Sequence, residues 1–207
     1  MDQKIERFVR GQAQLSEPVA ARLVAQNIPA GQGLFLANSM PIRDMDMYAD
    51  YKGHAPMISG NRGASGIDGL IASACGYAQG LKQPVTLMIG DLASLHDLNS
   101  LGQLKDIEQP VIMVVLNNGG AGIFSFLPIA EHKDVFEKFF GTPHPFTFEN
   151  AAAMFDLNYS RPMNAQQFTK VYAQALKSST ATIIEIMTSR EENLKIHKAL
   201  QNNAHER

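Results

Sequence analysis

Short apolar runs alternate with longer helix-compatible segments along most of the 207-residue chain. The apolar runs predict buried strands at 34–37, 56–59, 85–89, 111–116 and 182–186. Between them, the pattern predicts helices at 16–26, 42–49, 67–80, 95–107, 148–154 and 166–176, with a polar helix after the last strand. Strands that alternate with helices in this way predict an α/β fold, a doubly wound and mostly parallel sheet with helices on both faces.

Two regions do not follow this pattern. Residues 1–15 are polar and helix-compatible, and they predict a lead-in helix or linker before a single domain at 16–207. Ser16 is a plausible N-cap for the first helix of that domain. Residues 120–148 are rich in Gly, Pro, Phe and His and have weak periodicity. A segment of that length without a clear element is often functional.

Two turns flank the predicted helix at 95–107. Asp91 follows the strand at 85–89, and Asn118, Gly119 and Gly120 follow the next strand. Because one crossover joins these two parallel strands, both turns should lie at the same edge of the sheet, where α/β folds bind ligands. A carboxylate, a carboxamide and glycine carbonyls suit Mg²⁺, which usually binds together with phosphates. Each polar residue alone would more often cap a helix or stabilise a turn.

Other polar groups are predicted near this edge. The backbone N–H groups of Leu92, Ala93 and Ser94, together with the Ser94 hydroxyl, are natural donors to a diphosphate. Arg62 follows a predicted strand and could bind a carboxylate, although it could equally pair with Asp68 in a solvated turn. The Asn38-Ser39 turn with Arg43 also has two interpretations: it could bind a ligand, or Asn38 or Ser39 could merely cap a helix.

Composition excludes several classes of protein. The net charge of −2 gives no support for nucleic-acid binding, and no apolar run approaches the roughly 20 residues that a membrane span needs. The single cysteine, Cys75, fits a cytoplasmic protein and is predicted to pack rather than react. No zinc spacing is present, and His96 is expected to pack or cap. Surface positions are predicted for the other histidines: His54, His132, His144, His197 and His205.

The longer motifs resemble a known family. They are the segment 61–69, the Gly90-Asp91-Leu92 turn, the segment 96–99, Ile123-Phe124 and the segment 149–155. Together they are similar to the C-terminal, diphosphate-binding domain of the 2-succinyl-5-enolpyruvyl-6-hydroxy-3-cyclohexene-1-carboxylate synthases of menaquinone biosynthesis. The resemblance covers about residues 16–190 and implies the thiamine-diphosphate-binding fold. Leu92 departs from the wider superfamily, in which Gly is commoner after Gly-Asp.

The resemblance implies roles for individual residues. Asp91, the Asn118 side chain and the Gly120 carbonyl would bind Mg²⁺ or Mn²⁺, and Ile67 would keep the cofactor bent. Other residues would contact thiamine diphosphate: Asn38, Ser39, Gly90, Leu92, Ala93 and Ser94. The substrates would be held by Ser39, Arg43, Arg62, Ile123 and Phe124.

The implied activity is that of a transferase. It would decarboxylate 2-oxoglutarate and add the resulting succinyl carbanion to isochorismate. The glutamate that activates the cofactor belongs, in this family, to a pyrimidine-binding domain, so no catalytic residue is expected in this chain. We therefore expect a C-terminal fragment that is inactive alone and that needs the pyrimidine and middle domains. The complete enzyme is expected to be a homodimer or a dimer of dimers.

Two other functions fit the same residues less closely. The first is the diphosphate-binding domain of another thiamine enzyme, such as a 2-oxo acid decarboxylase or an acetolactate-type enzyme. The second is a non-catalytic α/β module that only pairs with a partner chain. Retention of both Asp91 and Asn118 argues against the second.

Overall fold

The computed structural model describes residues 2–12, 14–50, 52, 54 and 56–205. Its described part contains a six-stranded sheet in which every neighbouring pair of strands is parallel, with the order β2-β1-β3-β4-β6-β5. The strands are β1 (Gly33–Leu36), β2 (Met57–Ser59), β3 (Val85–Gly90), β4 (Val111–Asn117), β5 (Asn158–Ser160) and β6 (Thr182–Met187). The prediction of a doubly wound parallel α/β fold is confirmed.

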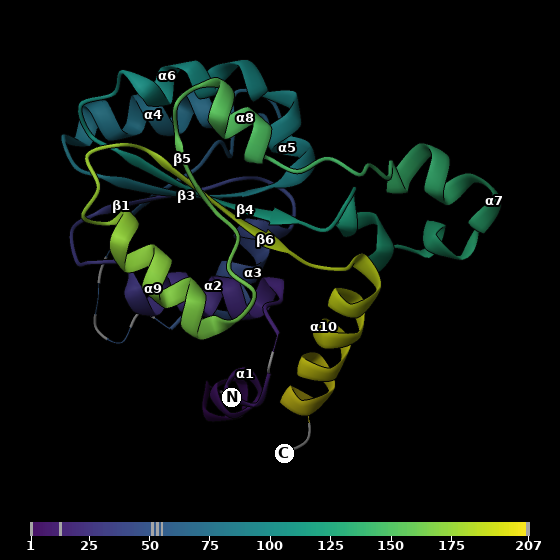
Figure 1. Ribbon diagram of the computed structural model, residues 1–207. Coiled ribbons are helices and arrows are strands. Elements are labelled where there is room, and N and C mark those ends of the chain that lie inside the picture. The colour runs from purple at the N-terminus through teal and green to yellow at the C-terminus, as the bar shows by residue number, and fades with distance from the viewer. Residues whose placement is uncertain (1, 13, 51, 53, 55, 206–207) are drawn as a thin grey trace.

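Helices cover both faces of the sheet (Figure 1). One face carries α4 (Leu70–Leu81), α5 (Asp91–His96), α6 (Leu101–Lys105) and α8 (Glu149–Met154). The other face carries α2 (Glu17–Asn27), α3 (Met40–Tyr48) and α9 (Ala165–Ala175). The two terminal helices, α1 (Asp2–Gly11) and α10 (Arg190–His205), lie beyond that second face.

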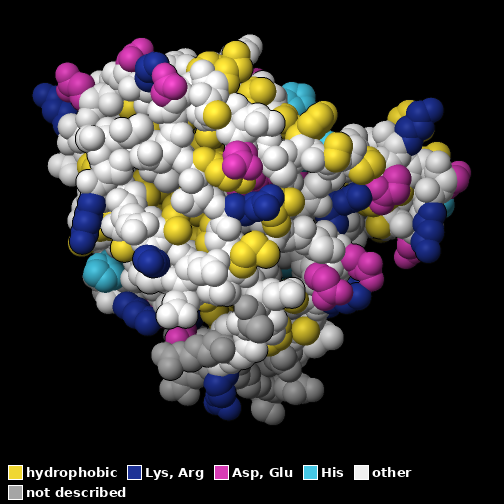
Figure 2. Space-filling view, in the orientation of Figure 1, with side chains coloured by type: hydrophobic (Ala, Val, Ile, Leu, Met, Phe, Trp, Pro, Cys, Tyr) yellow, Lys and Arg dark blue, Asp and Glu magenta, His cyan; other side chains and the backbone are white. Residues whose placement is uncertain are grey.

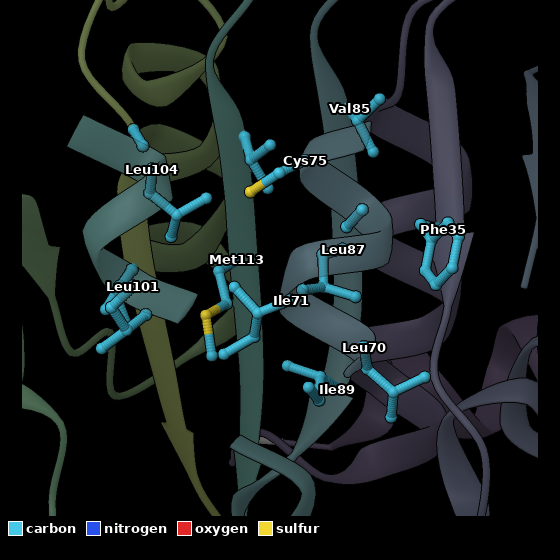
Figure 3. Packing of buried hydrophobic residues seen from close by; sticks show 14 of the residues in the cluster. Phe35, Leu70, Ile71, Cys75, Val85, Leu87, Ile89, Leu101, Leu104 and Met113 are labelled. Atoms are coloured by element: carbon cyan, nitrogen blue, oxygen red, sulfur yellow. The ribbon is translucent and has the colours of Figure 1, made fainter. Parts of the chain in front are cut away.

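The central strands separate two apolar cores, because successive side chains along each strand point to opposite faces of the sheet. On β4, Met113 and Val115 pack under α4, whereas Val114 and Leu116 pack toward α2 and α9. All four are 2% exposed or less, as expected for a strand buried on both faces. Figure 3 shows the first core, where Cys75 and other α4 residues point at the strands. The packing role predicted for Cys75 is confirmed, and burial raises the pKa of its thiol to about 11.

Helix boundaries agree with local capping chemistry. Ser16 caps α2, accepting a hydrogen bond from the Val19 N–H at 3.4 Å, as predicted. The predicted helix at 95–107 is instead divided into α5, a 3₁₀ turn (η1, Leu98–Ser100) and α6. At the interruption, Asp97 has a non-helical backbone, and its carboxylate caps α4, accepting from the N–H groups of Ile71 at 2.6 Å and Ala72 at 3.1 Å.

The segment after β4 forms an arm that projects from the sheet (Figure 1). It contains η2 (Gly122–Phe126), η3 (Pro128–Glu131), α7 (Lys133–Phe136) and a π-helical turn, η4 (Glu137–Gly141). Its exposed large apolar side chains are Leu127, Phe139 and Phe146. In Figure 2, apolar side chains gather between this arm and the body of the domain, and charged side chains mark its outer rim. In the part of the chain that the structure describes, no helix is long and apolar enough to cross a membrane.

Candidate functional site

A cavity of about 540 Å³ opens at the C-terminal edge of the sheet. Its walls come from the turns after β1, β3 and β4, from the first residue of α2, and from the arm. This is the edge where parallel sheets offer strand ends and helix N-termini to ligands. The two turns predicted to meet, those at Asp91 and Asn118, both line the cavity.

Asp91 is the first residue of α5 and is only 2% exposed. Its Oδ1 atom accepts from the Leu92 N–H at 2.6 Å, and its Oδ2 atom accepts from the Gly120 N–H at 3.0 Å. The second bond joins the turn after β3 to the turn after β4. Burial raises the pKa of Asp91, against the opposing effect of these N–H donors and of His144. The contacts of Asp91 are therefore those of an aspartate that caps a helix and joins two turns, and its carboxylate lies in the wall of the cavity.

The amide nitrogen of Asn118 points to Glu17. Its Nδ2 atom donates to Glu17 Oε1 at 2.8 Å, across 101 residues of sequence. Its Oδ1 atom is buried and has no hydrogen-bond partner among the described residues. A buried carbonyl oxygen without a partner is costly, by about 1–3 kcal/mol, unless a ligand completes it.

His144 lies beside the same carboxylate. Its Nδ1 atom accepts from the Phe146 N–H at 3.2 Å, so the ring proton is on Nε2, which lies 3.3 Å from Asp91 Oδ2. The His144 side chain is 6% exposed, so the prediction of a surface position is wrong. The arm folds back over the turn after β4, with the His144 N–H donating to the Gly119 carbonyl at 3.1 Å, and this contact buries the ring.

Behind Glu17 lies a second buried polar pair. Glu17 is 1% exposed, and Asp44 and His197 are both fully buried. The His197 Nε2 and Asp44 Oδ1 atoms are 2.6 Å apart, which connects α10 to α3. Burial and the nearby Asp44 charge raise the pKa of Glu17 to about 7. The predicted surface position of His197 is also wrong, because α3 supplies a carboxylate partner at the inner side of α10.

The two candidate substrate arginines lie in the wall of the same cavity. Arg62 donates to Asn38 Oδ1 at 2.6 Å, and Asn38 Nδ2 donates to the Gly66 carbonyl at 2.6 Å. Arg43 donates to the Ser39 carbonyl at 2.5 Å. Both arginines are exposed at the cavity mouth, and the described structure does not pair Arg62 with Asp68. Ser39 has φ 73° and ψ −133°, an unusual backbone conformation for a residue with a β-carbon.

Most other predicted residues also reach the cavity. Its wall includes Gly90, Leu92, Ala93 and Gly120, together with the apolar side chains of Ile67, Ile123 and Phe124. Ser94 is the exception. It is fully buried and lies outside the cavity wall, and its hydroxyl donates to the Gly90 carbonyl at 2.9 Å, so its contact with a diphosphate stays a prediction. Serine in the first turns of a helix often bonds back to the carbonyl four residues earlier in this way.

Some wall residues were not predicted from the sequence. Glu17, Phe139, Phe140 and Thr142 all line the cavity, and His96, expected to pack or cap, does so too. Glu17 is an acidic residue in the first turn of a helix, which is a common position for an acid, so the local sequence does not indicate a role in a site. Phe139 and Phe140 lie in the weakly periodic segment, and that weak periodicity was the only signal pointing to them.

The donor set fits a hard divalent cation. The described residues contain no group of three or more His, Cys, Asp or Glu side chains that could hold a metal. The candidate ligands are instead one carboxylate, one carboxamide and backbone carbonyls, which are the oxygen donors that Mg²⁺ prefers. The unpartnered Oδ1 of Asn118 is the observation in favour of this fit.

Comparisons with known proteins identify the family of the chain. Residues 30–186 match the family model described as "Thiamine pyrophosphate enzyme, C-terminal TPP binding domain". The chain is 51% identical over 201 residues to the 2-succinyl-5-enolpyruvyl-6-hydroxy-3-cyclohexene-1-carboxylate synthase of Prosthecochloris aestuarii, which covers 97% of this chain and 35% of that protein. It is 50% identical over 197 residues to the synthase of the same name from Rubrobacter xylanophilus, covering 95% and 34%. The chain thus spans about a third of the length of these relatives.

Solved structures share the fold at low identity. Benzoylformate decarboxylase from Polynucleobacter necessarius superposes with a TM-score of 0.72 at 16% identity, over 85% of this chain and 33% of that one. The thiamine diphosphate-dependent 4-hydroxybenzoylformate decarboxylase of Rhodococcus jostii gives a TM-score of 0.69 at 20% identity, over 86% and 33%. These two likenesses show the fold.

Proposed function

Since the chain belongs to the family of C-terminal TPP binding domains of thiamine pyrophosphate enzymes, we propose that it supplies the metal and diphosphate half of an active site. We assign that site to a 2-succinyl-5-enolpyruvyl-6-hydroxy-3-cyclohexene-1-carboxylate synthase of menaquinone biosynthesis, the name that its relatives at 50–51% identity carry. The domain corresponds to residues 16–207, with 1–15 as a lead-in helix.

One observation carries this proposal. Asp91 and Asn118 line the same cavity, and the Asn118 amide oxygen has no hydrogen-bond partner among the described residues. In the proposal, Asp91, Asn118 Oδ1 and the Gly120 carbonyl bind Mg²⁺ or Mn²⁺. The diphosphate lies against the N–H groups that begin α5, where Leu92 and Ala93 line the cavity. Asn38, Ser39 and Gly90 complete the contacts with the cofactor.

The remaining cavity wall suits an anionic substrate. Arg43 and Arg62 are exposed cations at its mouth, and guanidinium groups pair with carboxylates in bidentate geometry. With Ser39 they would hold the carboxylates of 2-oxoglutarate and isochorismate. Ile67, Ile123 and Phe124 would form the apolar side, which excludes water from the reacting carbon. Thiamine diphosphate, when bound, supplies the nucleophilic carbon for decarboxylation and transfer.

Several groups of such an enzyme are assigned to other parts of it. The glutamate that activates the cofactor is proposed to come from a pyrimidine domain, so this chain alone should bind thiamine diphosphate weakly and show no turnover. The exposed Leu127, Phe139 and Phe146 on the arm suit contact with a further domain or subunit. We propose a cytoplasmic homodimer or dimer of dimers for the complete enzyme.

The test is a calorimetric titration of the chain with Mg²⁺ and thiamine diphosphate together. Asp91→Ala and Asn118→Ala should abolish metal-dependent binding. Asp156→Ala is the matched control, because Asp156 is an exposed aspartate paired with Lys105 away from the cavity. Equal binding by Asp91→Ala and the unaltered chain would refute the metal site. Turnover of 2-oxoglutarate by the chain alone would refute the proposal that it supplies only half of an active site.

The second candidate function is that of another thiamine-dependent 2-oxo acid enzyme, which the shared fold of the two decarboxylases favours. Assays of the complete enzyme separate the two. Consumption of 2-oxoglutarate with isochorismate supports the synthase, and consumption of pyruvate instead supports the alternative.

A further inference from the structure

We infer that Glu17 is a positioning residue that fixes the orientation of the Asn118 amide, so that its oxygen and not its nitrogen is available to a metal ion. The inference rests on the proposed function, because Asn118 matters here as a metal ligand. It assigns a role to a residue of α2 that makes no proposed contact with cofactor or substrate.

The amide geometry supports this assignment directly. A carboxamide has an NH₂ group that only donates and an oxygen that only accepts. Asn118 Nδ2 lies 2.8 Å from Glu17 Oε1, so its donor end is committed to the carboxyl group. The other end, Oδ1, is buried and has no hydrogen-bond partner among the described residues, and Asn118 lines the cavity. Rotation of the amide by half a turn would place two oxygens against each other and present N–H groups to a cation.

Glu17 is itself held rigidly. It is 1% exposed, at the N-terminus of α2, where the helix dipole favours an acidic group. Asp44, which also lies behind the cavity wall, is close enough for its charge to act on Glu17. The burial of the Asp44 carboxylate is compensated by His197, whose Nε2 atom lies 2.6 Å from Asp44 Oδ1. Glu17 therefore has a fixed place between a buried ion pair and the Asn118 amide.

Outer groups of this kind tune metal sites measurably. Removal of a partner that orients a ligand typically costs 10–100-fold in metal affinity. Glu17→Leu removes the acceptor but keeps the volume, and it should weaken metal binding at least tenfold. Glu17→Gln keeps a side-chain oxygen that accepts from Asn118, so its metal affinity should stay within about threefold of the unaltered chain.

The experiment is a titration of the chain with Mn²⁺ in the presence of thiamine diphosphate, with free Mn²⁺ followed by electron paramagnetic resonance. Thr86→Val is the matched control, because it removes a buried hydrogen bond, to Tyr172 at 2.7 Å, away from the cavity. Urea unfolding of each variant reports its stability separately. If Glu17→Leu does not fold, Glu17→Met takes its place, because its unbranched side chain adapts to irregular space.

A double-mutant cycle with Asn118→Ala isolates the mechanism. If Glu17 acts through Asn118, Glu17→Leu should weaken binding no further in the Asn118→Ala background. Unchanged affinity in Glu17→Leu, or independent effects that add in the double variant, would overturn the inference while leaving the metal site intact. Absence of diphosphate-dependent Mn²⁺ binding by the unaltered chain, or unchanged binding by Asp91→Ala, would overturn the proposed function and this inference together.

Discussion

The side-chain nitrogen of Asn118 occupies the space beside the α-carbon of Gly122: a β-carbon on Gly122 would lie 2.6 Å from Nδ2. Real β-carbons are essentially never found so close to another heavy atom. Movement of the amide would cost its hydrogen bond, because the same nitrogen donates to Glu17 Oε1 at 2.8 Å. Gly122 therefore makes room for one particular position of a proposed metal ligand.

Gly122→Ala should displace the Asn118 amide and weaken metal binding, by tenfold or more if the ligand is lost. The substitution should also lower the free energy of unfolding by about 1–3 kcal/mol, as overpacked sites do. Mn²⁺ titration with thiamine diphosphate measures the first effect, and urea unfolding measures the second.

Gly76→Ala is its matched control. Gly76 lies inside α4, and apart from its neighbours and the backbone of that helix, no atom of the described residues lies within 4 Å of a β-carbon placed there. Alanine there should raise the free energy of unfolding by up to about 1 kcal/mol through helix propensity and leave metal affinity unchanged. Normal metal binding by Gly122→Ala would show that the amide has another way to fit.

A second prediction concerns the backbone of Ser39, which has φ 73° and ψ −133° at the cavity wall. Such conformations cost residues with a β-carbon about 1–3 kcal/mol, and glycine avoids that strain. Glycine also loses more entropy on folding, by about 0.5–1 kcal/mol. Ser39→Gly should therefore raise the free energy of unfolding by about 1 kcal/mol, measured by urea titration. Ser65→Gly, at a serine of the same cavity without positive φ, should lower it.

The sequence predicted the sheet well because five of the six strands are apolar runs. The sixth, β5, was missed because Asn-Tyr-Ser has no apolar run, and it forms only where β6 offers an edge. The helix at 95–107 was predicted as continuous, but it is interrupted at Asp97, whose carboxylate caps α4. A contact between residues 26 positions apart in the chain has no local signature.

The site was predictable where strand ends determine it. Asp91 and Asn118 follow neighbouring parallel strands, so topology alone brings them to one edge. Glu17 and His197 were not predictable, because each depends on a partner more than 100 residues away. His197 lies in a helix with a polar sequence, and only the packing of α10 beside Asp44 makes it an internal residue.

A third prediction concerns Glu185, a fully buried carboxylate on β6. It accepts from Asn117 Nδ2 at 2.6 Å, from the Tyr159 hydroxyl at 2.6 Å and from the Phe148 N–H at 3.2 Å. Glu185→Gln replaces an acceptor by an NH₂ group that must face one of these donors. The free energy of unfolding should fall by about 2–4 kcal/mol, measured by urea titration.

Tyr159→Phe provides the comparison for Glu185→Gln. It removes one of the three donors and leaves the carboxylate in place, so it should cost only about 1 kcal/mol. If Glu185→Gln is as stable as the unaltered chain, the three hydrogen bonds contribute nothing net to folding.

The last prediction is a pH dependence of stability that arises from His197. Its Nδ1 atom donates to the Asn193 carbonyl at 2.8 Å, and its Nε2 atom lies 2.6 Å from Asp44 Oδ1. Burial lowers the pKa of His197, but the hydrogen bond and charge of Asp44 outweigh this effect, so the pKa is raised above 6.5. Glu17 faces the ring from α2 and acts in the same direction. Two uncharged rings, Tyr48 and Phe126, complete its surroundings.

Because the folded state holds this proton more tightly than the unfolded state does, His197 stabilises the fold at pH values below 6.5. That stabilisation is lost as pH rises through the folded-state pKa, with a slope of at most about 1.4 kcal/mol per pH unit. Glu17, whose pKa is raised to about 7, adds a loss between about pH 4.5 and 7. Glu17 is almost fully deprotonated above about pH 8, so urea unfolding from there upward isolates the His197 contribution from that of Glu17. His197→Gln should flatten this part of the profile, whereas His132→Gln, at an exposed histidine of the arm, should leave it unchanged. Stability that rises with pH above 7 in the unaltered chain would contradict a raised pKa of His197 beside Asp44.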